Sequence, residues 1–188
     1  YSVLQKARRI VKNRESYAYY KFLLELAERT EDESYISELD IPDKKIYTYF
    51  KSFKYYLLYD YKNAVELLKN SNVDLGPFGN LKREFLLLRS EAGQALGRKD
   101  YYERAKRIME QLDENNPLHV RLLIDIYIFI SVIARSNPSK VLEYLRKAEK
   151  LALDYNVAHK LPSIYNNLAV EITNTTISMQ YLERAVEA

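Results

Sequence analysis

The chain has 188 residues, of which 47% are hydrophobic and 29% are charged, a composition typical of a globular protein with a buried core. Its net charge of +3 is the small difference between 29 basic and 26 acidic residues, which argues against a domain dedicated to nucleic acid. The absence of cysteine excludes disulfides, thiolate metal sites and cysteine nucleophiles. It also fits a reducing compartment, so we expect a cytoplasmic protein.

Periodic apolar segments separated by prolines, without sustained alternation, predict an all-α fold. The longest apolar stretch, residues 122–134, is interrupted by Asp125 and is too short to cross a bilayer, so we expect no membrane contact. Asn116 before Pro117 and Ser139 before Lys140 are the expected helix starts. In chain order, the expected helices cover residues of about 2–14, 17–29, 32–39, 44–59, 61–70, 80–97, 100–113, 117–136, 139–155, 160–174 and 177–187.

Residues 1–43 show no clear repeat, and we expect a helical segment that is either a degenerate repeat or a connector. Its first helix carries five bases, which fit either a plain amphipathic surface helix or a contact with phosphates: Lys6, Arg8, Arg9, Lys12 and Arg14. The chain starts at Tyr1 without a methionine, so we expect it to be a piece of a longer protein.

From residue 44 onward the expected helices come in pairs, and the second helix of each pair carries small or apolar residues at positions i, i+4 and i+7. The first members of this pattern lie 41, 36 and 37 residues apart. A period of that length indicates stacked helix pairs. The four instances are Ala64/Leu68/Ser71, Ala105/Met109/Leu112, Val141/Leu145/Ala148 and Ser178/Leu182/Ala185.

The first helix of each pair carries an aromatic or apolar residue followed by a large and a small one, most clearly at Tyr165, Leu168, Ala169 and Ile172. Weaker instances are Arg89/Ala92/Gly93/Leu96 and Tyr127/Ile130/Ser131/Ala134. With residues 100–105 and Pro117, these positions resemble the tetratricopeptide repeat over residues 44–188. Residues 160–169 are similar to the repeat regions of bacterial signal-responsive transcriptional regulators. The resemblance implies an α–α superhelix, a solenoid of antiparallel helix pairs that binds a partner in its concave groove.

Catalytic motifs are missing from the sequence. The two histidines, His119 and His159, have no metal-ligand spacing around them, and no glycine-rich phosphate loop occurs. We therefore expect a protein that is not an enzyme and that holds no metal or cofactor.

The resemblance also implies which residues face the groove. Asparagine amides suit a peptide backbone, because they both donate and accept, and bases suit a carboxylate. We expect a protein or peptide partner, a second copy bound through the terminal repeats, and a role as the sensor or oligomerisation part of a transcriptional regulator. A static assembly scaffold and a nucleic-acid-binding helical domain remain alternatives. The expected groove residues are Lys51, Tyr55, Gln94, Arg98, Arg135, Asn166, Asn167 and Asn174.

Overall fold

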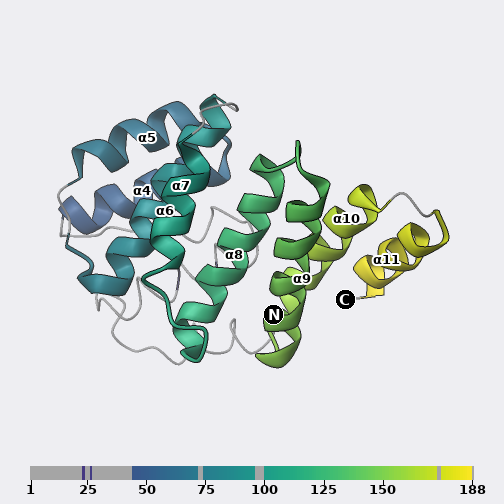
Figure 1. Cartoon of the computed structure of the whole chain (residues 1–188). Helices are drawn as coiled ribbons and strands as arrows, with labels where there is room; N and C mark the ends of the chain where they lie inside the picture. The colour runs from purple at the N-terminus through teal and green to yellow at the C-terminus, as the bar shows by residue number, and fades with distance from the viewer. Residues whose placement is uncertain are drawn as a thin grey trace. The chain divides into compact units, whose positions relative to one another are not determined.

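The fold is known from a computed structural model, which describes Leu23, Leu26 and residues 44–71, 74–95, 100–172 and 175–187. Within these ranges the chain forms eight α-helices and one 3-10 turn, which confirms the all-α prediction (Figure 1). None of the helices in these ranges has the length and apolarity needed to cross a bilayer.

The chain divides into two compact units, Tyr1–Leu75 and Gly76–Ala188. In the first unit, α4 (Lys44–Leu57) packs against α5 (Tyr61–Asn70). Phe50 and Phe53 of α4 and Leu68 of α5 are buried. The expected division at residue 43 stays a prediction, because residues 1–43 lie almost wholly outside the described residues.

The second unit contains six of the helices and the 3-10 turn Ala158–Lys160. Successive helices pack as antiparallel neighbours, and α8 to α11 follow one another across Figure 1. Their apolar faces share one core, in which Ile108, Leu123, Leu145 and Ile164 are fully buried. Pairwise packing of successive helices is therefore confirmed, whereas the superhelical path stays a prediction. The helices are α6 (Gly76–Gln94), α7 (Tyr101–Met109), α8 (Pro117–Ile133), α9 (Pro138–Asp154), α10 (Leu161–Glu171) and α11 (Thr175–Glu187).

The even-numbered helices of this unit also touch their next-but-one neighbours. The ring of Phe85 on α6 meets the ring of Phe129 on α8 edge to face, with centroids 5.7 Å apart. Asp125 on α8 forms an ion pair of 2.7 Å with Lys160, immediately before α10. This contact explains how the apolar helix α8 accommodates a carboxylate, because the lysine partly neutralises it.

The odd-numbered helices are joined in the same way by tyrosines. The hydroxyl groups of Tyr102 on α7 and Tyr144 on α9 are hydrogen bonded at 3.0 Å. Arg146 on α9 donates a hydrogen bond to the hydroxyl of Tyr181 on α11 and lies over its ring. Helices α6, α7 and α9 are thus each linked to the helix after the next one, and α8 is linked to the 3-10 turn before α10.

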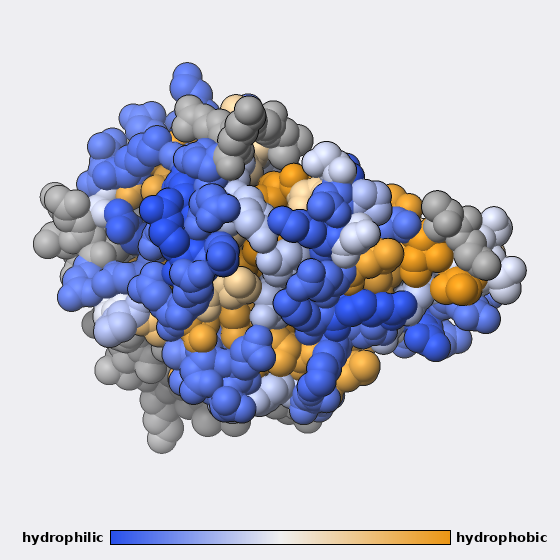
Figure 2. All heavy atoms as spheres, in the orientation of Figure 1, coloured by the Kyte–Doolittle hydropathy of each residue, from blue (hydrophilic) through white to orange (hydrophobic). Residues whose placement is uncertain are grey.

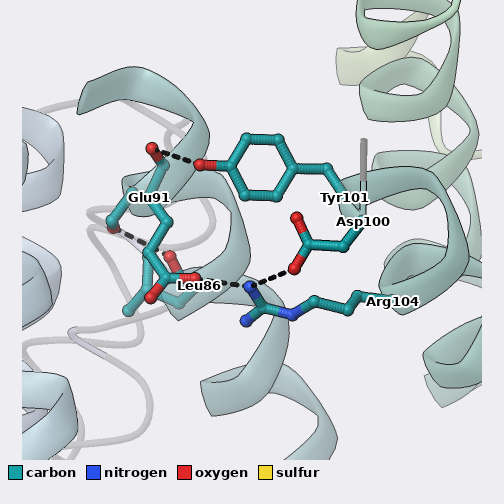
Figure 3. A network of polar contacts seen from close by, with 6 residues as sticks. Leu86, Glu91, Asp100, Tyr101 and Arg104 are labelled. Atoms are coloured by element: carbon teal, nitrogen blue, oxygen red, sulfur yellow. Dashed lines mark hydrogen bonds and ion pairs between the residues drawn. The ribbon is translucent and has the colours of Figure 1, made fainter. Parts of the chain in front are cut away.

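A polar network joins α6 to α7 (Figure 3). The carboxylate of Glu91 is nearly buried and pairs with the guanidinium of Arg104 at 2.5 Å. Tyr101 donates its hydroxyl proton to the backbone carbonyl of Glu91 at 2.9 Å, and Asp100 lies 4.0 Å from the same guanidinium. These contacts connect the end of α6 to the first turn of α7.

Of the two helix starts expected from caps in the sequence, one is confirmed and one is wrong. At α8, Asn116 accepts a hydrogen bond from the backbone of Leu118, and Pro117 is the first helical residue, as predicted. At α9 the prediction of Ser139 as the cap is wrong. The side chain of Asn137 accepts from the backbone N–H of Lys140 instead, because Pro at the first helical position needs no donor of its own.

The stretch 71–80, expected as a loop, is partly helical. Helix α6 begins at Gly76, whose φ of +74° suits glycine, and Pro77 occupies the first turn, where its missing N–H costs nothing. The helix therefore starts four residues earlier than the expected residue 80, since glycine and proline here form a helix start and not a break.

The i, i+4, i+7 pattern faces the core in α5 and in α9, where Val141, Leu145 and Ala148 are buried. In α11 the prediction is wrong for Leu182, the middle residue of the pattern. Leu182 is 39% exposed, and the neighbouring Tyr181 is buried instead. The inward face of α11 runs through Tyr181 because this ring packs against Tyr165 of α10, with centroids 5.8 Å apart. Gly93, expected at a close helix crossing, is also exposed.

Candidate functional site

The expected groove residues fall in both units of the chain. Lys51 and Tyr55 lie on α4 in the first unit, whereas Gln94, Arg135, Asn166 and Asn167 lie in the second. Arg98 and Asn174 lie outside the described residues. Gln94 is exposed at the end of α6. A single groove formed by all of them therefore stays a prediction, and the second unit offers the set that can be described together.

On α10, one exposed face carries three residues at helical spacing: Ser163, Asn166 and Val170. Val170 is 70% exposed. Asn166 is exposed and has no hydrogen bond or ion pair in the described part of the chain. Asn167 borders the face. Its side-chain amide already donates a hydrogen bond to the backbone carbonyl of Ser163 at 2.8 Å.

On α8, the side away from the core carries a second set with the same helical spacing. Asp125 and Val132 are half-buried, and Arg135 is exposed directly after the helix ends. Arg135 has no ion pair in the ranges that the structure describes. Further toward the start of this side, Arg121 is exposed as well.

The ion pair between Asp125 and Lys160 fixes the register between these two helices. Because α8 and α10 are both antiparallel to α9, they run in the same direction. This ion pair links the segments that carry the two exposed sets. We name these sets together the α8–α10 face: Asp125, Val132, Arg135, Ser163, Asn166 and Val170.

The α8–α10 face offers three kinds of contact. Val132 and Val170 supply apolar area, Asn166 supplies an amide donor and acceptor, and Arg135 supplies a fixed positive charge. Lys160 already neutralises Asp125, so the unpaired charge on the face is positive. Such a surface suits a segment with an apolar side chain, exposed backbone amides and a carboxylate.

The core beneath the face is apolar and tightly packed. Tyr165, next to Asn166, points inward, and burial, followed by the nearby charge of Glu149, raises the pKa of its phenol. The phenol therefore stays protonated at neutral pH, and Tyr165 adds no negative charge beneath the α8–α10 face.

Arg135, Asn166 and Asn167 were expected from the sequence as groove residues, and their role in binding stays a prediction. The two valines and Lys160 were not expected. The valines carry no polar signal, and only their exposure after folding distinguishes them from core residues. Lys160 was detectable in principle, because the lone acid in the apolar helix α8 needs a basic partner.

The two histidines lie in different surroundings. His119 accepts a hydrogen bond at Nδ1 from the backbone N–H of Asp113 at 3.0 Å, and its ring stacks on Phe78, with centroids 5.0 Å apart. His159 is exposed in the 3-10 turn. Within the described ranges, no group of three or more histidine, aspartate or glutamate side chains is placed to hold a metal ion.

Apolar side chains reach the surface over α10 and the adjoining part of α11 (Figure 2). They include Val170 of the α8–α10 face and Ile177 of α11, which are both exposed. The chain matches no family model, no curated protein and no solved structure.

Proposed function

We propose that the second unit is a non-catalytic binding module whose α8–α10 face takes a segment of a partner protein or a peptide. The observation that carries this proposal is the exposure of Val170 beside the unpartnered amide of Asn166. An exposed aliphatic side chain next to an unused donor and acceptor supplies both apolar and polar contacts to a bound segment.

The chemistry of the face also limits the ligand. A segment in extended conformation presents backbone amides to Asn166 and places an apolar side chain against Val132 and Val170. An acidic residue of that segment pairs with Arg135. The concave superhelix implied by the tetratricopeptide resemblance would bring further helices to the same ligand.

We further propose that this module is the sensor or oligomerisation part of a larger transcriptional regulator. This role depends on the resemblance of residues 160–169 to the repeat regions of such regulators, and thus on fold analogy. Binding would change the placement of whatever is attached to the module. Small-angle scattering with and without ligand tests this idea, and identical curves would rule it out.

The binding proposal is tested with a displayed library of random peptides, selected on the immobilised chain. Enriched peptides are then synthesised, labelled and titrated by fluorescence anisotropy. We expect selected peptides to combine an aliphatic residue with an acidic one. Arg135→Ala and Asn166→Ala should each weaken binding by about 5- to 30-fold, corresponding to about 1–2 kcal/mol.

The chain offers a matched control for each substitution. Arg107 on α7 and Gln180 on α11 are exposed and, in the described part of the chain, have no side-chain ion pair or hydrogen bond. Arg107→Ala and Gln180→Ala should bind as the unchanged protein does. If the control substitutions weaken binding as much as the test substitutions, the α8–α10 face is not the binding site.

A static assembly scaffold is the second candidate, and α11 supports it. Met179, Leu182 and Val186 form an exposed apolar stripe at helical spacing on the side that does not touch α10. A second copy would cover this stripe. Sedimentation at increasing concentration tests the candidate: Leu182→Glu should abolish any self-association, and a monomer at all concentrations would exclude it.

A further inference from the structure

Helix α4 of the first unit carries tyrosines and a lysine on one exposed side, at every fourth position. Tyr47 is 41% exposed, and Tyr59, just beyond the helix, is 74% exposed. Between them lie Lys51 and Tyr55, both half-exposed. We name these four residues the tyrosine stripe. Residues four apart are neighbours on a helix surface, so the helical part of the stripe, from Tyr47 to Tyr55, follows the helix axis for about 12 Å.

The lysine of the stripe lies between two rings. The Nζ of Lys51 is 5.8 Å from the ring centroid of Tyr47 and 6.0 Å from that of Tyr55. A positive charge is thus held beside two aromatic faces that remain partly open to solvent. Aromatic faces stack on bases, and an ammonium group pairs with a phosphate.

The last tyrosine of the stripe has a left-handed backbone conformation, which glycine or asparagine adopts more readily. Tyr59 has φ of +59°, and the helix ends with hydrogen bonds from Tyr59 to Tyr56 and from Asp60 to Tyr55. This is the usual left-handed helix ending, in which glycine or asparagine is preferred. Helix α9 ends in the same way with Asn156 at φ of +52°. At Tyr59 the chain instead places a large exposed ring, against the local preference.

The segment around the stripe is slightly basic. Residues 44–75 contain six lysines and three acidic residues, so this short segment alone carries a net charge of +3. That equals the net charge of the entire chain. Its lysines are Lys44, Lys45, Lys51, Lys54, Lys62 and Lys69, and its acids are Asp60, Glu66 and Asp74.

From exposed rings at regular spacing, an interposed lysine and a local positive charge, we propose that the tyrosine stripe binds single-stranded nucleic acid. Bases stack on the rings of Tyr47, Tyr55 and Tyr59, and the intervening phosphates pair with Lys51. A duplex does not fit this mode, because its bases already stack on one another. The site lies in the first unit, so this proposal does not depend on the proposed function of the α8–α10 face in the second unit.

The test is a titration of the whole chain with a fluorescein-labelled oligothymidylate of about 16 nucleotides, followed by anisotropy at several salt concentrations. We expect binding at low salt that weakens as salt increases. Tyr47→Ala should weaken binding about 5- to 150-fold, the range for loss of one stacked base, whereas Tyr47→Phe should retain it. Lys51→Met should reduce the slope of log K against log salt by about 0.7, the value for one phosphate of a single strand.

Lys62→Met on α5 is the matched control, because Lys62 is exposed in the same unit but lies off the stripe. It should change both affinity and slope less than Lys51→Met does. Circular dichroism checks that each variant keeps its helices, and Tyr47→Phe and Lys51→Met keep the test valid if Tyr47→Ala fails to fold.

Three results would overturn the proposal. The first is no binding of the oligothymidylate at low salt. The second is equal competition by polyglutamate, which means that the surface binds any polyanion or acidic protein and not stacked bases. The third is equal effects of Lys51→Met and Lys62→Met, which means that the lysines act only through general charge.

Discussion

The ion pair between Glu91 and Arg104 allows a quantitative test of how α6 and α7 are held together. The two side chains retain 9% and 20% of their exposure, respectively. Removing one partner of a fully buried pair costs about 3–5 kcal/mol, because the other charge stays buried without compensation. Since water still reaches Arg104, we expect Arg104→Met to lower the free energy of unfolding by about 2–3 kcal/mol.

The measurement is urea unfolding followed by far-ultraviolet circular dichroism. With a urea dependence of about 1–3 kcal/mol per molar, the loss should move the midpoint by about 1 M. Glu91→Gln and the double substitution complete a thermodynamic cycle that isolates the coupling between the two side chains. Arg107→Met, three residues further along α7, controls for the loss of an exposed arginine and should change stability by less than about 0.5 kcal/mol.

The expected coupling energy exceeds 1 kcal/mol, as for a desolvated and hydrogen-bonded pair. If Arg104→Met and Arg107→Met prove equally stable, the pair contributes nothing measurable. The α6–α7 junction would then be stabilised by other contacts, among them the hydrogen bond from the hydroxyl of Tyr101 to the carbonyl of Glu91.

Three further substitutions test local features of the fold. Burial, followed by the hydrogen bond to Tyr102, raises the pKa of Tyr144 above its ordinary value of 10.0, so its stabilising contribution is present below pH 10 and is lost at higher pH. Tyr144→Phe should therefore flatten the alkaline decline of the urea midpoint, and an unchanged decline would contradict this assignment. Asn137→Ala removes the cap that accepts from Lys140 and should lower stability by about 1 kcal/mol in urea unfolding, whereas Asn137→Ser should retain most of it. Tyr59→Gly should raise the thermal midpoint, because glycine adopts the positive φ without strain and the free energy of unfolding increases by about 0.5–1 kcal/mol. A lower midpoint would show instead that the exposed ring stabilises the fold.

Much of the fold follows from spacing in the sequence. Prolines at helix starts and apolar residues at helical intervals are local signals, and they located all eight helices of the described ranges to within about four residues at each end. Helix α6 shows where such signals fail. The same glycine and proline that end one helix also start another, and only the surrounding packing decides between the two.

The candidate site was less predictable than the fold. Polar groove residues such as Asn166 and Arg135 can be proposed from a repeat register, but Val170 cannot. An apolar residue in an amphipathic helix is assigned to the core unless the tertiary structure leaves it uncovered, and exposure is a property of the packed helices. Leu182 and Tyr181 illustrate the same limit, because both fit an apolar stripe and only ring packing on Tyr165 selects the tyrosine.

The contacts between next-but-one helices have a kinetic consequence. The hydroxyl pair of Tyr102 and Tyr144 spans 42 residues and the ion pair of Asp125 and Lys160 spans 35, so these tertiary links are not local in the sequence. Each of them closes a loop of several helices, and the loop entropy is lost before the contact forms. Local opening at α11 would break the contacts of Tyr181 while leaving the α6–α7 junction intact. We therefore expect local unfolding to begin at α11 while α8 stays folded. Hydrogen exchange of the backbone amides should accordingly be fastest in α11 and slowest near α8.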